Sequence, residues 1–260
     1  MDGRSRGIDV SHNDDNGNVL NWSSIASLGI DFAVAKASQG VGFQDPQFRN
    51  NWQAIKAAGL IRGAYHMIGF VDPTANPSWQ DVVHRQIDRF LGIVGPLQSG
   101  DLPPALDIEN LDSKAGWSNL IQHNRSAALA VVREYITYTT AQLNGVFPIL
   151  YTGSFWWSDL GDPDPGSMPF SAYPLWFAQY PYMPVPPGSN REASSFADYA
   201  SFLDGKQPTH IPKVWGGPGS PSWAFWQFTE AGTPPGHMSG ALDLDVFHGT
   251  RADLMQLCVK

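Results

Sequence analysis

Short apolar runs recur along the chain and are separated by turn-forming residues. Most of these runs are continuously hydrophobic, which is typical of strands buried on both faces, as in parallel α/β architectures. The pattern predicts eight strands, at residues 8–10, 32–35, 63–68, 105–108, 148–151, 175–179, 224–228 and 241–246.

Helical patterns lie between several of these runs. Asp45 and Pro46 form a helix start signal, and Gly59 is placed to end that helix. Apolar residues at helical spacing predict two further helices, over residues 79–94 and about 119–143. The alternation of eight strands with an incomplete set of helices indicates an α/β fold, a modified (β/α)8-like barrel.

The length of 260 residues, 42% of them hydrophobic, fits one barrel of about 250 residues. Residues 1–260 are therefore predicted to form a single domain. Residues 181–222 are rich in Pro and Gly and predict a long loop excursion from it.

Charge and hydrophobicity exclude several classes of partner. Only 15% of residues are charged and the net charge is -8, so no basic face is expected for nucleic acid. No apolar run approaches the roughly 20 residues of a membrane span, and no signal peptide is recognisable, so no membrane partner is expected. Cys258 is the only cysteine, which excludes an intrachain disulfide.

Two carboxylates lie two residues apart at the end of an apolar run, in Asp107-Ile108-Glu109. In an extended strand, Asp107 and Glu109 share one face while Ile108 points to the other. Two close carboxylates resist ionising together, which favours a protonated form that acts as a general acid. Glycoside hydrolysis needs such a pair, although an ordinary strand end with two solvated acids has the same spacing.

Barrel closure brings further acids towards this pair. The first predicted strand carries Asp9 and the last carries Asp243 and Asp245. Barrel active sites gather at the C-terminal ends of the strands, where a cluster of such acids must hold protons or bind a cation. Asp243 and Asp245 share a face, so the pattern alone does not choose between them.

Aromatic residues near the predicted C-terminal strand ends are candidates for lining a carbohydrate cleft. A ring with a polar edge stacks on a sugar and still forms hydrogen bonds. His66 is interpreted instead as a hydrogen-bonded structural histidine. The predicted cleft residues are Tyr65, Tyr151, Trp176, Tyr180 and Trp226.

Ordered motifs cover essentially the whole chain. They are Gly7-Ile8-Asp9-Val10-Ser11-His12, Phe32-Ala33-Val34-Ala35-Lys36-Ala37-Ser38-Gln39-Gly40, Asp45-Pro46-Gln47-Phe48, Ala64-Tyr65-His66, Leu106-Asp107-Ile108-Glu109, Leu175-Trp176-Phe177-Ala178-Gln179-Tyr180, Trp226-Gln227-Phe228 and Leu242-Asp243-Leu244-Asp245-Val246-Phe247. Together these motifs resemble those of glycoside hydrolase family 25, the CH-type lysozymes.

The resemblance implies a muramidase that cuts the β-1,4 bond between N-acetylmuramic acid and N-acetylglucosamine in peptidoglycan, with no metal or organic cofactor. Glu109 matches the general acid, and Asp107 matches a partner that acts through the substrate's 2-acetamido group or more directly. Asp9 matches the first-strand acid and Asp243 the last-strand acid, while Asp245 replaces the usual Asn. We expect a monomer that acts on the bacterial cell wall, as a phage endolysin or delivered effector rather than a secreted enzyme.

Two other functions stay open on the residues alone. A metal-dependent hydrolase or glycan deacetylase would use Asp9, His12 and His66 as ligands together with the Asp107 pair, although no close pairing of histidines supports it. A non-catalytic wall-binding barrel would have lost turnover. The presence of both Asp107 and Glu109 favours an enzyme over that alternative.

Overall fold

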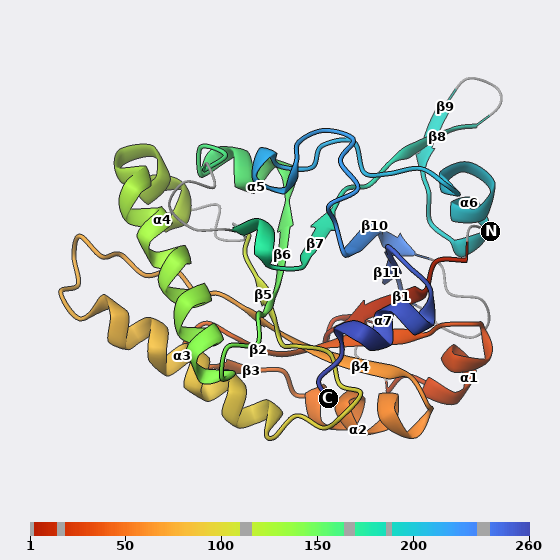
Figure 1. Cartoon of the computed structure of the whole chain (residues 1–260), viewed down its shortest axis with the longest axis horizontal. Helices are drawn as coiled ribbons and strands as arrows, with labels where there is room; N and C mark the ends of the chain where they lie inside the picture. Colours follow the sequence, from red (N-terminus) through yellow and green to blue (C-terminus); the bar gives the residue numbers. More distant parts are fainter. Residues whose placement is uncertain (1–2, 15–18, 110–115, 164–169, 186–188, 233–239) are drawn as a thin grey trace.

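Eight strands form a closed barrel at the centre of the structure, a computed structural model that describes residues 3–14, 19–109, 116–163, 170–185, 189–232 and 240–260. The strands are β1 (Arg6–Val10), β2 (Phe32–Gln39), β4 (Ile61–Met67), β5 (Ala105–Asp107), β6 (Ile149–Gly153), β7 (Leu175–Ala178), β10 (Phe225–Gly232) and β11 (Leu242–Phe247). Their order is β1-β11-β10-β7-β6-β5-β4-β2, and pairing of β2 with β1 closes the ring. All eight predicted strands are present, and the predicted barrel class is confirmed (Figure 1).

The last strand runs against the others. Neighbouring strands from β1 through β2, β4, β5, β6 and β7 to β10 pair in parallel, whereas β11 pairs antiparallel with both β10 and β1. The expectation of parallel strands is therefore wrong for β11. The chain between β10 and β11 is shorter than the roughly dozen residues that a parallel crossover needs. As a result, the start of β11 lies at the edge of the barrel where β1 ends.

Side chains of the strands alternate between the barrel interior and the layer beneath the helices. In β2, Phe32 and Val34 belong to the interior cluster, whereas Ala33 and Ala35 belong to the outer one. The same period of two recurs around the ring. The interior apolar positions include Phe32, Ile61, Ala105, Ile149, Trp176 and Phe225, with Leu254 and Cys258 from the C-terminal segment.

Helices surround the barrel without forming a full set. They are α1 (Trp22–Ser27), α2 (Phe48–Ala57), α3 (Trp79–Val94), α4 (Trp117–Gln142), α5 (Ser154–Asp159) and α7 (Arg251–Leu257). Of these, α7 contributes Leu254 to the interior. The two longest, α3 and α4, lie side by side on one flank (Figure 1). In the described parts of the chain, no helix is both long and apolar enough to cross a bilayer.

Helix α3 has the predicted bounds, but α2 starts later than its sequence signal. Its N-cap is Gln47 rather than Asp45. The Asp45 carboxylate accepts the backbone N–H of Gln47 at 2.9 Å and that of His12 at 2.9 Å. Asp45 therefore ties the turn before α2 to the loop that follows β1.

Helix α4 corresponds to the long predicted helix, with one interruption. Asn124 has non-helical dihedrals, φ -151° and ψ 69°, inside the helix. Its side-chain oxygen accepts the backbone N–H of Ala127 at 3.1 Å, as an N-cap residue does. The apolar stripe continues across the interruption, which is why the pattern predicted a single helix.

The predicted loop excursion at residues 181–222 contains ordered elements. They are β8 (Tyr182–Val185), β9 (Ser189–Glu192), α6 (Phe196–Asp198), a π-helical turn (Tyr199–Leu203) and a 3-10 turn (Lys213–Trp215). Strands β8 and β9 pair as a hairpin that projects from the body of the molecule (Figure 1). Residues 186–188 lie outside the described residues.

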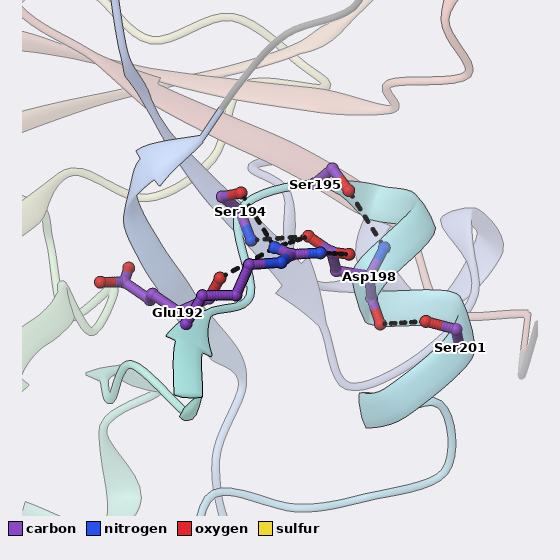
Figure 2. A network of polar contacts seen from close by, with 6 residues as sticks. Glu192, Ser194, Ser195, Asp198 and Ser201 are labelled. Atoms are coloured by element: carbon purple, nitrogen blue, oxygen red, sulfur yellow. Dashed lines mark hydrogen bonds and ion pairs between the residues drawn. The ribbon is translucent and has the colours of Figure 1, made fainter. Parts of the chain in front are cut away.

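Asp198 organises the turn that follows this hairpin. Its carboxylate pairs with the Arg191 guanidinium and accepts the backbone N–H of Ser194 at 3.0 Å. Its own N–H donates to Ser195, and its carbonyl accepts the Ser201 hydroxyl (Figure 2). Mainly through the hydrogen bonds from Arg191, the pKa of Asp198 falls to about 2.

Candidate active site

A small, open cavity of about 60 Å³ lies within the barrel. Strands β1, β4, β5, β6, β7, β10 and β11 all contribute to its wall, and Glu109 lies two residues after the end of β5. Barrel closure therefore gathers side chains that are far apart in the sequence. The lining residues are Asp9, Tyr65, Asp107, Glu109, Tyr151, Trp176, Gln227 and Asp243.

Strand β5 brings its two acids to this cavity together. Asp107 ends the strand, opposite Met67 of β4 and Tyr151 of β6. Ile108 is fully buried in the outer apolar layer, and Glu109 lines the cavity again. Asp107 is only 5% exposed, whereas Glu109 is half-buried. Of the two, Glu109 is the group more open to a ligand.

Burial and mutual repulsion hold protons on this pair. Burial raises the pKa of Asp107 well above its usual range, and the charge of Glu109 raises it further, while Lys36 lowers it. Burial also raises the pKa of Glu109, against the opposing charge of Lys36. Because the two groups titrate together, the pair keeps a proton at a pH where solvated acids have lost theirs.

Gln227 connects the remaining polar groups of the cavity. Its Nε2 donates to the Asp9 carboxylate at 2.7 Å and to the Asp243 carboxyl group at 3.3 Å. Its Oε1 accepts the hydroxyl groups of Tyr151, at 2.8 Å, and Tyr180, at 2.7 Å. Four side chains from four segments thus share one amide, which orients both acids.

Gln227 was missed among the predicted site residues, although the sequence carries a signal for it. The run from Ala224 to Phe228 is apolar except at this position. A polar side chain inside a continuously buried strand must find polar partners in the interior. That requirement marks Gln227, which is 2% exposed, as a member of an internal polar site.

Asp9 and Asp243 lie opposite each other in the register of β1 and β11. Burial raises the pKa of Asp9 to about 7, although the hydrogen bond from Gln227 lowers it. Burial, and next the charge of Asp9, raises the pKa of Asp243 to about 11. Asp9 is therefore the first of these two acids to become anionic as the pH rises.

Asp245 lies deeper in the barrel than Asp243. It pairs with Gly7 of β1 and Gln227 of β10 and is fully buried. Trp176 Nε1 donates to its Oδ1 at 2.8 Å. Both acids face the interior, as the period of two requires, but only Asp243 lines the cavity. The register of β11 therefore decides between Asp243 and Asp245, which the sequence pattern alone did not.

Three of the five predicted aromatic residues line the cavity. Trp176 meets Tyr65 edge-on with ring centroids 6.2 Å apart, and meets Tyr151 at 4.9 Å. Tyr180 is joined to the site through its hydrogen bond to Gln227.

Trp226 does not line the cavity, contrary to the expectation from its place near a strand end. Its neighbour Gln227 takes the inward position, so the Trp226 ring faces the outer layer. There it is 1% exposed and packs near Tyr199 and Phe228, and its Nε1 donates to the carbonyl of Gln179 at 2.8 Å.

The two histidines considered as metal ligands, His12 and His66, do not line the cavity. His66 is fully buried and stacks on Phe90, with its ring nitrogens 2.9 Å from Ser38 Oγ and 3.4 Å from Gln86 Oε1. Burial lowers its pKa to about 3, so this ring stays neutral. His12 pairs with Asp45 at 2.9 Å. Within the described ranges, no three His, Cys, Asp or Glu side chains are grouped to hold a metal ion.

Comparison with known proteins identifies the family of this chain. The sequence model described as Glycosyl hydrolases family 25 matches residues 8–237. Lysozyme M1 of Streptomyces globisporus is 29% identical over 255 residues, which are 97% of this chain and 70% of that protein.

Solved structures of lysozymes share the fold. The bacterial lysozyme from Streptomyces coelicolor superimposes with a TM-score of 0.70 and 28% identity, covering 98% of this chain and 96% of the other. A family GH25 lysozyme from Aspergillus fumigatus gives a TM-score of 0.71 at 23% identity, covering 99% of this chain and all of the other, 100%. The barrel fold is thus shared by proteins of diverged sequence.

Proposed function

Because the chain belongs to the glycosyl hydrolases of family 25, we propose that it is a muramidase that hydrolyses the β-1,4 bond between N-acetylmuramic acid and N-acetylglucosamine in peptidoglycan. The observation that carries this proposal is the joint placement of Asp107 and Glu109 in one cavity of the barrel. Acid-assisted glycoside hydrolysis uses two carboxyl groups beside the scissile bond, one of which protonates the leaving oxygen.

Glu109 acts as the general acid. It is the more exposed member of the pair, and burial raises its pKa, which favours its protonated form. The proton passes to the glycosidic oxygen as the bond from that oxygen to the anomeric carbon breaks. An oxocarbenium-like charge develops on the sugar that remains.

Asp107 stabilises that charge, either through the substrate's 2-acetamido oxygen or directly. The pair shares a proton, so Asp107 carries the negative charge when Glu109 holds it. Lys36 lowers the pKa of both acids, so its charge favours one anion within the pair. A water molecule then attacks the anomeric carbon and returns a proton to Glu109, with overall retention of configuration.

Asp9 and Asp243 orient the sugar at the opposite wall of the cavity. Their carboxyl oxygens are held by Gln227, so the hydrogen-bonding positions offered to hydroxyl or acetamido groups are fixed before the substrate binds. Tyr65, Tyr151 and Trp176 supply the apolar surface on which a pyranose ring packs.

The cleaved bond is the first test of this function. Purified peptidoglycan digested by the protein and reduced with borohydride should yield fragments that end in reduced muramic acid, measured by mass spectrometry. Reduced glucosamine ends would mean that the other glycosidic bond is cut. Deacetylated but uncut strands would indicate a deacetylase, and uncut wall that retains the protein would indicate a binding module.

The pH dependence of turnover should report the proton on Glu109. Its raised pKa places the alkaline fall in kcat/KM above the ordinary glutamate range. Lys36→Met should move that fall to higher pH, because a charge that lowers the pKa of Glu109 is gone. Glu230→Gln should move it to lower pH, because a charge that raises this pKa is gone. Shifts of both variants in the same direction would contradict the assignment.

A further inference from the structure

The proposed mechanism gives no role to the carboxyl group of Asp245. It lies beneath the cavity in β11 and is fully buried. The side chains that face it come from four strands: Asp9 of β1, Trp176 of β7, Gln227 of β10 and, on its own strand, Asp243. Its neighbourhood therefore holds other acids and neutral donors.

The two oxygens of Asp245 have different surroundings. Oδ1 accepts the indole N–H of Trp176 at 2.8 Å. Oδ2 is buried and accepts no hydrogen bond from any donor in the described part of the chain. The Asp245 carboxyl group is, however, within hydrogen-bonding contact of the Asp9 carboxyl group. Two anions cannot share such a contact, so one of these acids must carry a proton.

We propose that Asp245 is a positioning residue that stays protonated and donates the hydrogen bond from its second oxygen to the Asp9 carboxylate. Oδ1 then acts as the carbonyl oxygen that accepts the Trp176 N–H, and Oδ2–H becomes the donor that an ionised carboxylate in this place would lack. Every polar atom of the group thereby gains a partner.

The electrostatics of the two acids agree with this placement of the proton. Burial raises the pKa of Asp245 well above its usual range, and the charge of Asp9 raises it further. The pKa of Asp9, at about 7, is raised less, because the hydrogen bonds from Gln227, Asp245 and Asp243 lower it against burial and the charge of Asp14. Tyr65 and Asp107 also face Asp9 across the cavity.

Asp245 thus acts on the reaction through Asp9. A fixed donor beneath Asp9 holds its carboxylate in one orientation and favours its anionic form, so that Asp9 is charged at a lower pH than burial alone allows. This effect on turnover rests on the proposed function. The proton on Asp245 does not, and it is measurable in the protein without substrate.

The first test compares the stability of wild type and Asp245→Asn across pH. Asn keeps the shape, accepts the Trp176 N–H and donates to Asp9, but it has no proton to lose. For an acid whose pKa is raised on folding, the stability cost is absent below its unfolded pKa and grows as the pH rises. The Tm gain of D245N should be near zero at about pH 4 and reach about 5 °C or more at about pH 7.

The control for this comparison is Asp81→Asn on the exposed first turn of α3, which should show no Tm gain at either pH. A Tm difference for D245N that does not change with pH would overturn the proposal. This outcome would not depend on whether the protein cuts peptidoglycan.

The second test uses turnover. Asp245→Ala removes the donor, so the acid limb of the kcat/KM profile should move up by about one pH unit, with a fall of about tenfold at about pH 5. Asp245→Asn keeps a donor and should restore the wild-type pH profile. Repair of a packing defect alone would not return the acid limb to its wild-type pH. Coincident profiles for D245A and D245N would overturn the positioning role, whereas a wild type without turnover would refute the proposed function alone.

Discussion

Glu109→Gln is expected to reduce the rate of peptidoglycan hydrolysis by about 10²- to 10⁴-fold. The amide keeps the size and hydrogen-bonding shape of the acid but has no proton to give to the leaving oxygen. Because Glu109 lines the cavity and is half-buried, the substitution removes the proton without removing packing. The rate is measured as the release of reducing ends from purified peptidoglycan.

A matched variant separates this chemical effect from a loss of charge. Glu134→Gln makes the same substitution on α4, where Glu134 pairs with His84 and does not line the cavity. This control should retain the wild-type rate. Neither variant should lower the Tm by more than about 2 °C, because surface and isosteric changes cost little stability. Wild-type turnover by E109Q would rule out Glu109 as the acid.

Arg62→Ala is expected to lower the free energy of unfolding by about 3–5 kcal/mol, because it leaves a buried acid without its partner. The Arg62 guanidinium binds both oxygens of Asp101, at 2.8 and 2.9 Å. It also donates to the backbone carbonyl of Trp52 at 3.0 Å, and it lies over the Trp52 ring, 3.8 Å from the ring centre. Urea unfolding monitored by circular dichroism measures the loss.

The pH dependence of this loss identifies its cause. In the wild type, burial raises the pKa of Asp101, but the hydrogen bonds from Arg62 and from the Gln98 N–H outweigh it and lower the pKa overall. Stability from this acid is therefore lost as the pH falls. In R62A the hydrogen bonds from Arg62 are gone, so burial raises the pKa of Asp101. Protonation of Asp101 then relieves the cost of the buried charge, and the variant should become more stable as the pH falls. Lys56, 3.6 Å from Asp101 with its side chain 42% exposed, compensates little.

A double variant tests the same point by another route. Arg62→Met combined with Asp101→Leu removes both charges, and it should recover part of the stability that Arg62→Met alone loses. Equal instability of the single and double variants would show that packing on Trp52, rather than the unpaired carboxylate, accounts for the loss.

The strands could be predicted from the sequence because each is a buried apolar run of characteristic length. The period of two also predicts that the side chains of Asp107 and Glu109 lie on the same face of the strand, and both line one cavity. Errors arose where a local signal had a different use in three dimensions. Asp45 resembles an N-cap residue, yet its oxygens bind the turn before α2 and the loop after β1.

The reversed direction of β11 was not predictable from apolar runs, because a buried strand has the same composition in either direction. This reversal brings Asp243 beside Asp9, at the same edge of the barrel. Trp226 was misplaced for a related reason: proximity to a strand end does not say which of two neighbours faces inward. Its partner in the strand, Gln227, holds that position.

By itself, the sequence determined the family, the barrel class and the acids of the first, central and last strands, because these depend on local pattern and on ordered motifs. Only the tertiary structure decided which of these acids share the cavity, which one is buried beneath it, and that Gln227 joins them. The physical reason is that strand direction and register, together with burial, set the neighbours of each carboxyl group. Those neighbours decide which acid holds a proton.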